Sequence, residues 1–138
     1  MMRIDIISVI PALMHSFFGH SICKRASDAG LVDIIFHDLH DFSLKKHRQV
    51  DDYPFGGGAG MLLQVQPLFD AIEKNHLEDT HVIFPSPKGP RLDQNKLEQL
   101  ATMGEITLVA GRYEGIDQRF IDTYVDEQIS LGDFIITG

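Results

Sequence analysis

The chain has 138 residues, 43% hydrophobic and 23% charged, which suits one folded domain and excludes an intrinsically disordered protein. No stretch approaches the roughly 20 apolar residues of a membrane span, and Asp5 interrupts the apolar N-terminal run, which argues against a signal peptide. The net charge of −8 counts against a nucleic-acid binder, while the single Cys23 excludes an internal disulfide and fits the reducing cytoplasm.

Apolar residues recur along the chain with the spacings of strands and helices. Apolar runs predict buried strands at residues 3–10, 32–36, 81–84, 105–110 and 125–129, and a further extended run at 134–136. Helical spacing predicts helices at 11–18, 21–30, 66–77, 93–104 and 118–124, with Ser21 and Asp93 as candidate N-caps. This alternation predicts an α/β fold, a mostly parallel sheet flanked by helices with 105–110 as its central strand.

Residues 37–60 break the pattern and are predicted to form a long loop. Glycines at 56–60 match neither a dinucleotide fingerprint, which would need glycine in place of Met61, nor a Walker A loop. Their amides could bind an anion or the backbone of a large partner, or the run is an ordinary loop. The basic residues 45–48 could contact phosphates, or they are simply solvated. His37 and His40 have neither an HExxH pattern nor a cysteine pair beside them, which argues against a closed transition-metal site.

Three loops follow predicted parallel strands, at residues 85–90, 111–115 and 130–133. Because parallel strands end at the same edge, these loops are expected to form one slot, rich in glycine and proline, suited to an adenine and its ribose. Gly111 would admit a ligand to the backbone and Gly115 would permit a sharp turn, although an ordinary strand-to-helix loop has the same spacing. No Ser-His or Cys-His arrangement stands out, so the pattern favours a nucleoside-containing cofactor over hydrolase chemistry.

Four segments together carry a resemblance to a known family: His47 to Met61, Val65 to Leu68, Ala110 to Arg119, and Ser130 to Phe134. They resemble the bacterial tRNA (guanine-N1)-methyltransferase (TrmD) family of the SPOUT superfamily. The resemblance implies a domain with a trefoil knot in its C-terminal half, an obligate homodimer, and an S-adenosylmethionine site beside the dimer interface. It also implies methylation of N1 of the guanosine at position 37 of tRNA, helped by magnesium.

The same resemblance assigns roles to individual residues. The cofactor-binding residues would lie on the three loops: Ser86 and Pro87; Gly111, Tyr113 and Glu114; and Leu131, Gly132, Asp133, Phe134, Ile135, Ile136 and Gly138. Glu114 would face the methionine end of the cofactor or bind magnesium, which makes it the candidate catalytic residue. The loop from His47 to Gly60 would contact tRNA, with candidate contacts His47, Arg48, Tyr53, Gly57 and Gly58.

The strand-like ending at Gly138 predicts that a C-terminal portion is missing. The family continues with the last helix of the knot, a linker and a basic helical domain that carries the aspartate expected as general base and an important arginine. Residues 1–138 are therefore expected to be an incomplete SPOUT domain that does not methylate alone, and the missing basic domain would explain the acidic balance. The alternatives are a non-catalytic nucleotide-binding α/β module and a dimerising structural core.

Overall fold

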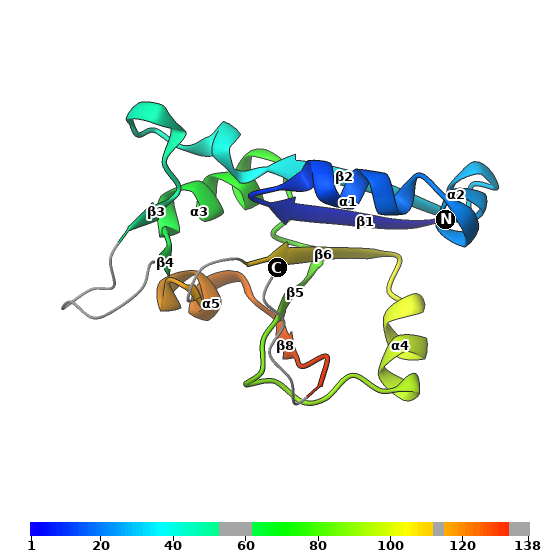
Figure 1. Cartoon of the computed structure of the whole chain (residues 1–138). Coiled ribbons are helices and arrows are strands. Elements are labelled where there is room, and N and C mark those ends of the chain that lie inside the picture. The colour runs from blue at the N-terminus through cyan, green and yellow to red at the C-terminus, as the bar shows by residue number, and fades with distance from the viewer. Residues whose placement is uncertain (53–61, 112–114, 133–138) are drawn as a thin grey trace.

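The computed structural model describes residues 1–52, 62–111 and 115–132, which form two sheets and the helices around them (Figure 1). The larger sheet has five parallel strands in the order β2-β1-β6-β5-β8. Its strands are β1 (Met2–Ser8), β2 (Val32–Asp38), β5 (His81–Pro85), β6 (Glu105–Ala110) and β8 (Glu127–Ile129). The parallel sheet and the central place of β6 confirm the predicted fold class.

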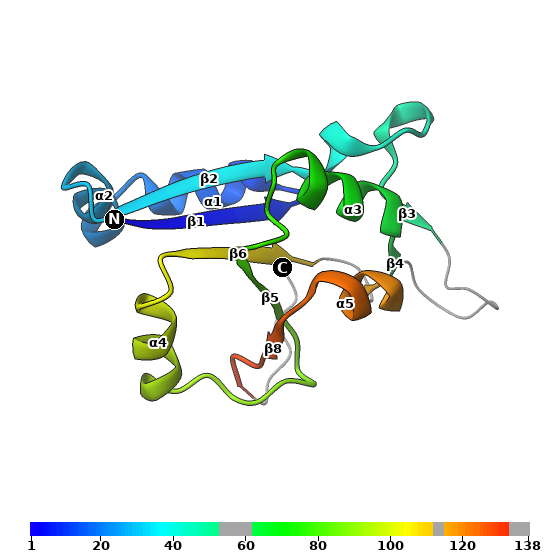
Figure 2. The ribbon, with the colours of Figure 1, turned by 180° about the vertical axis from the view of Figure 1, so that it is seen from behind.

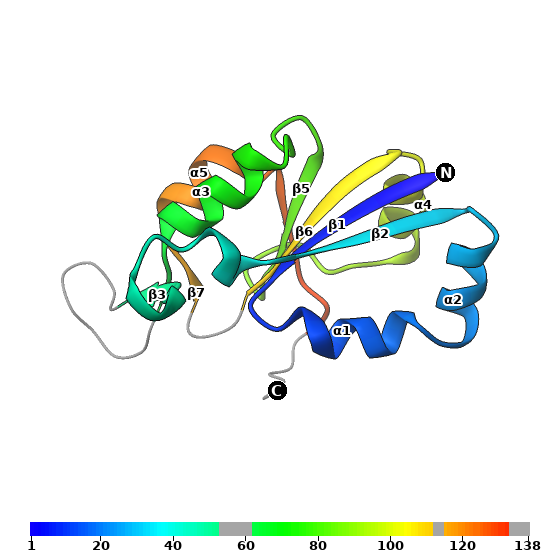
Figure 3. The same cartoon turned by 90° about the horizontal axis from the view of Figure 1, so that it is seen from above.

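In the described residues, five helices and two short 3₁₀ turns connect the strands. They are α1 (Pro11–Phe18), α2 (Ser21–Asp28), α3 (Val65–Lys74), α4 (Gln94–Ala101) and α5 (Gln118–Tyr124), with the turns η1 (Leu39–Phe42) and η2 (Lys46–Arg48). Figure 3 shows α1 and α2 on one side of the strands and α3 and α5 on the other. None of the helices in the described residues combines the length and apolar character that crossing a bilayer requires.

Of the two predicted N-caps, one is confirmed and the other is wrong. Asp93 caps α4, since its Oδ1 accepts a hydrogen bond from the Lys96 amide at 2.8 Å, as predicted. Ser21 is not a cap: the N-cap of α2 is His20, and no side chain caps it. Ser21 instead has a φ of 57°, in the left-handed region.

The second sheet was not predicted. Its two-residue strands are β3 (Asp51–Asp52), β4 (Leu62–Leu63) and β7 (Gly115–Ile116), with β4 antiparallel to β3 and parallel to β7. Gly115, expected to turn the chain directly into a helix, has a φ of 152° and pairs with Leu62. The sheet therefore joins residues 51–52, 62–63 and 115–116, which lie far apart in the sequence.

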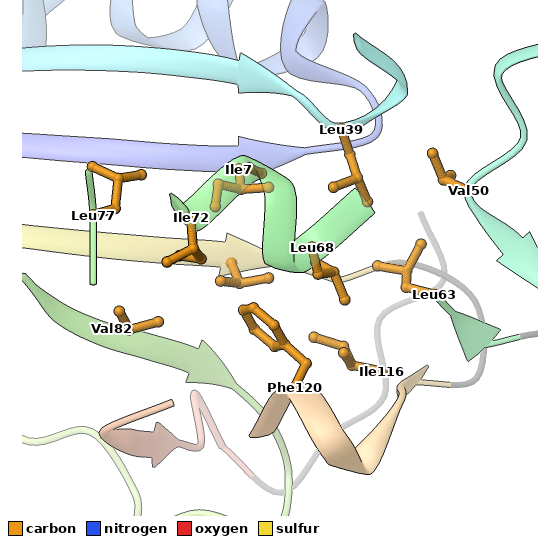
Figure 4. Close-up of a cluster of buried hydrophobic side chains, with 12 residues drawn as sticks. Ile7, Leu39, Val50, Leu63, Leu68, Ile72, Leu77, Val82, Ile116 and Phe120 are labelled. Atoms are coloured by element: carbon orange, nitrogen blue, oxygen red, sulfur yellow. The ribbon is translucent and has the colours of Figure 1, made fainter. Parts of the chain in front are cut away.

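The core lies on the face of the large sheet covered by α3 and α5, the helices that lie toward the viewer in Figure 2. Figure 4 shows Phe120 of α5 facing Leu68 and Ile72 of α3, all three at 0% exposure. Strand side chains from the same face, including Ile7 and Val109, complete this cluster. It fixes the relative positions of β1, β5 and β6.

The opposite face, covered by α4 and by α1 with α2, is less completely packed. Its buried cluster consists of Ile83, Leu100, Ile106 and Ile129. Between α4 and the strands lies an apolar cavity of about 420 Å³ that also contacts Leu97 and Leu131. Helix α1, described throughout, has no buried residue. This face therefore leaves apolar side chains exposed.

Candidate cofactor site at the carboxyl edge of the sheet

Strands β6, β5 and β8 are parallel neighbours, so the three predicted loops begin at the same edge of the sheet. The arrowheads of β1, β2 and β6 point to the left in Figure 1, which is the carboxyl edge. Open α/β sheets bind ligands in the crevice outside this edge.

The first loop, predicted at residues 85–90, and the third, predicted at 130–133, are joined by backbone hydrogen bonds that involve residues 86, 90 and 92 on one side and 129 and 130 on the other. The Ser86 amide donates to the Ile129 carbonyl at 2.9 Å, the Ser130 amide to Pro90 at 2.8 Å, and the Leu92 amide to Ser130 at 2.7 Å. The close approach requires glycine at position 89, where a Cβ would lie 2.2 Å from the Gln128 carbonyl oxygen. The two loops therefore form one unit.

The second loop begins at Gly111, directly after β6. A Cβ at Gly111 would lie 3.1 Å from Cε1 of Phe84, a residue of β5 close to the start of the first loop. The structure thus places Gly111 beside the strand that leads to Ser86 and Pro87. The other candidates on this loop, Tyr113 and Glu114, lie outside the described residues.

Among the described residues of the three loops, the buried polar side chains are those of two serines. Ser86 and Ser130 are buried, and the Ser130 hydroxyl donates to the Gly132 carbonyl at 3.1 Å and accepts from its amide at 3.2 Å. Gly132 has a φ of 153°, which favours glycine. Leu131 is 60% exposed. The remaining candidates of this loop lie outside the described residues: Asp133, Phe134, Ile135, Ile136 and Gly138.

An ion pair follows the second loop at the start of α5. Asp117 caps the helix by accepting from the Arg119 amide at 2.9 Å, and the Arg119 guanidinium also contacts its carboxylate at 2.7 Å. The hydrogen bond from the Arg119 side chain lowers the pKa of Asp117. The Asp117 amide donates to the Leu63 carbonyl at 3.1 Å, which ties α5 to the small sheet.

The basic residues at 45–48 lie in and beside η2, at the same edge of the sheet as the loops (Figure 1). His47 and Arg48 have φ values of 63° and 56°, a conformation that is uncommon for residues other than glycine. The Arg48 guanidinium pairs with Asp41. Both of these candidate RNA contacts are exposed, whereas Tyr53, Gly57 and Gly58 lie outside the described residues.

Histidines 37 and 40 each pair with a carboxylate. His37 Nε2 lies 2.8 Å from Oδ1 of Asp5, and His40 Nδ1 lies 2.9 Å from Oδ1 of Asp38. Asp5, at 0% exposure, also accepts from Arg3. In the described ranges we find no group of three or more histidines, cysteines and carboxylates arranged to hold a metal ion.

Comparison with known proteins agrees with this architecture. The family model described as tRNA (Guanine-1)-methyltransferase TrmD matches residues 2–138. A tRNA (guanine-N(1)-)-methyltransferase from Flavobacterium psychrophilum is 45% identical over 99% of this chain and 62% of its own length. One from Dictyoglomus turgidum is 43% identical over 100% of this chain and 56% of its own length.

A solved structure gives the same result. The crystal structure of tRNA (m1G37) methyltransferase from Aquifex aeolicus superimposes with a TM-score of 0.86 at 34% identity, covering 98% of this chain and 62% of that one. This chain therefore spans about 56–62% of the length of these relatives. The chain belongs to the TrmD family of tRNA (guanine-1)-methyltransferases.

Proposed function

We propose that the chain is the cofactor-binding part of a cytoplasmic enzyme that transfers the methyl group of S-adenosylmethionine to N1 of guanosine 37 in tRNA. The observation that best supports this is the common edge from which the three loops leave β5, β6 and β8, in a chain of the TrmD family. Relatives that carry the activity in their names support the substrate class.

The described residues of the loops fit such a cofactor. Adenosine needs an apolar contact and main-chain hydrogen-bonding groups. Exposed Leu131 directly follows Ser130, in the loop that the Ser86 amide joins through the Ile129 carbonyl. The charged side chains of the first loop, Lys88 and Arg91, are exposed. In this proposal Pro87, Gly111 and Gly132 shape the pocket, and Tyr113, Glu114 and residues 133–136 and 138 complete it.

In this proposal the reaction has two requirements: the methyl donor and the guanine must be aligned, and the proton on guanine N1 must be removed. Bound S-adenosylmethionine supplies a methyl group already activated by the sulfonium. Guanine N1 becomes a good nucleophile only when its proton leaves, which needs a base and a positive charge near O6. The loops of this chain orient the reactants, and Glu114 takes the role of magnesium ligand or contact to the methionine end. The general base would lie in the C-terminal portion of the longer relatives, so we expect residues 1–138 to bind cofactor without methylating.

The tRNA would be held in part by the basic segment 45–48. This segment carries a local positive charge in a chain of net charge −8, as a phosphate contact requires. His47 and Arg48 take the left-handed conformation there, and a strained backbone is often a feature of binding sites. Tyr53, Gly57 and Gly58 belong to the same proposed surface.

A homodimer is the proposed assembly. Leu13 and Phe17 of α1 are 70% and 69% exposed, and Ile22 of α2 is 71% exposed. Leu13 and Phe17 are four residues apart and so share a face of α1, and exposed apolar groups on one face indicate an interface. Sedimentation of the purified chain should give a dimer, and Phe17→Glu should give a monomer.

The experiment that tests the function uses this chain and a chimera in which the C-terminal portion of the Flavobacterium psychrophilum relative follows Gly138. Calorimetry should show that both bind S-adenosylhomocysteine and that Gly111→Trp abolishes the heat. The chimera should methylate tRNA transcripts with guanosine at position 37 and spare those with adenosine there. Absence of binding would contradict the proposal, and binding without transfer would favour a non-catalytic nucleotide-binding module.

A further inference from the structure

Strand β8 has three residues and lies at the edge of the large sheet, so few backbone bonds hold it. It begins at Glu127 and leads directly into the third loop. Just before it, the Asp126 amide donates to the Val82 carbonyl at 2.9 Å, and the Asp126 carboxylate accepts from the Val82 amide at 2.8 Å. The placement of the third loop therefore depends on its backbone bonds to the first loop and on the side chains that hold this short strand.

Glu127 is held by two basic side chains from two other elements. Its Oε2 lies 2.5 Å from Nε2 of His81 on β5, and its Oε1 lies 2.7 Å from Nζ of Lys96 on α4. The Glu127 side chain is 19% exposed. Burial alone would raise its pKa, but the hydrogen bonds from Lys96 and His81 outweigh burial and hold the pKa of Glu127 below its usual value. The carboxylate thus joins β8, β5 and α4.

These three elements are the ones that carry the first and third loops. The first loop leaves β5 and enters α4, whose first turn is capped by Asp93 through the Lys96 amide. The third loop leaves β8. Glu127 consequently ties the strand before the first loop, through His81 at its start, and the helix after that loop, through Lys96 in its first turn, to the strand that precedes the third loop. His81, Glu127 and Lys96 together are called the clasp below.

We propose that Glu127 is a positioning residue of the cofactor site: through His81 and Lys96 it holds the first and third loops in their binding geometry. This inference rests on the proposed function. Partly buried ion pairs add little net stability because desolvation offsets their attraction, and they can serve to select one conformation. Loss of the clasp should accordingly loosen the two loops more than it destabilises the whole fold.

The first test is Glu127→Gln in the full chain, which keeps the shape and removes the charge. Its matched control is Glu98→Gln, which removes the same negative charge from an exposed position of α4. Nuclear magnetic resonance titration with S-adenosylhomocysteine should show an affinity about tenfold weaker for Glu127→Gln and unchanged for the control. Amide exchange should become about tenfold faster at Ser86, Leu92 and Ser130, and stay unchanged at Asp117, whose amide bonds to the small sheet.

The second test removes one partner of Glu127. The groups facing Glu127 are Lys96 from α4 and His81 from β5, and Asp126 on its own stretch is bonded to Val82. Lys96→Met removes the ammonium that contacts Oε1 of Glu127 and leaves the contact with His81 in place. Cofactor affinity of Lys96→Met should therefore fall, whereas Lys96→Arg, which keeps the charge, should change little.

The outcomes separate this inference from the proposed function. Equal affinity and equal exchange in Glu127→Gln and the unsubstituted chain would overturn the inference, as would faster exchange at Asp117 by the same factor. A Lys96→Met variant with the affinity of the unsubstituted chain would also overturn it. If the unsubstituted chain itself binds no cofactor, the proposed function fails, and the role of Glu127 at that site fails with it.

Discussion

The two faces of the large sheet are built differently. On the face covered by α3 and α5, residues such as Leu68, Ile72 and Phe120 are fully buried, and the packing is continuous with the small sheet. On the face covered by α4, four buried residues border an apolar cavity of about 420 Å³. The first face thus fixes the strands, while the second, where the clasp lies, positions the loops and leaves apolar surface accessible. Stability and binding should respond separately to substitutions on the two faces.

The largest expected effect on stability comes from a substitution on the face covered by α3 and α5. Phe120→Ala removes a ring at 0% exposure and should lower the free energy of unfolding by about 3–5 kcal/mol. Urea denaturation followed by circular dichroism measures the change. Leu97→Ala on α4, where the side chain is 47% exposed, is the comparison and should cost less than about 1 kcal/mol. Equal losses for the two variants would contradict the difference between the faces.

The next effect concerns the contact between the first and third loops. Gly89→Ala places a Cβ 2.2 Å from the Gln128 carbonyl oxygen, so the loops must move apart. We expect a loss of about 1–3 kcal/mol in unfolding free energy, together with weaker binding of S-adenosylhomocysteine in calorimetry. Lys88→Ala, an exposed neighbour, is the control for stability. An alanine at 89 without effect would show that the loops do not need this contact.

A smaller effect separates the true helix cap from the one predicted wrongly. Asp93→Ala removes the hydrogen bond to the Lys96 amide and should cost about 1 kcal/mol. Ser21→Ala removes no cap and should change stability by less than about 0.5 kcal/mol. Thermal denaturation of both variants gives the comparison, and the reverse order would contradict the assignment of the caps.

The smallest effect is that of Glu127→Gln on how the free energy of unfolding falls at acidic pH. The pKa of Glu127 is lower in the folded chain than the ordinary value of 4.5. The unfolded chain therefore binds more protons near that pH, and the stability from the clasp is present above pH 4.5 and lost as pH falls below it. Denaturation between about pH 7 and pH 3 should show a smaller acid loss for Glu127→Gln than for the unsubstituted chain. Identical pH profiles would argue against an ionised clasp.

The sequence predicted those elements whose pattern is local. The strand 105–110 and the helix 118–124 coincide with β6 and α5, because six or seven residues suffice to show a period. The common edge of the three loops followed from the parallel sheet alone. Asp93 was predictable as a cap because its hydrogen bond spans three residues.

The elements that were missed depend on distant partners. Each strand of the small sheet has two residues, too few for an alternating pattern. Asp5 is buried because His37 lies beside it on the neighbouring strand, and the clasp joins residues 81, 96 and 127. Neither contact leaves a signal in the local sequence. The trefoil knot and the roles of Tyr113 and Glu114 stay predictions, since 112–114 and 133–138 lie outside the described residues.

The central claim is that one site forms where β5, β6 and β8 end. The most direct measurement follows the backbone amide resonances of the chain as S-adenosylhomocysteine is added. We expect Ser86, Gly111 and Gly132 to shift together with one binding constant, while Asp117 at the small sheet shifts less. Shifts confined to the basic segment 45–48, or different binding constants for Ser86 and Gly132, would contradict a single site at this edge.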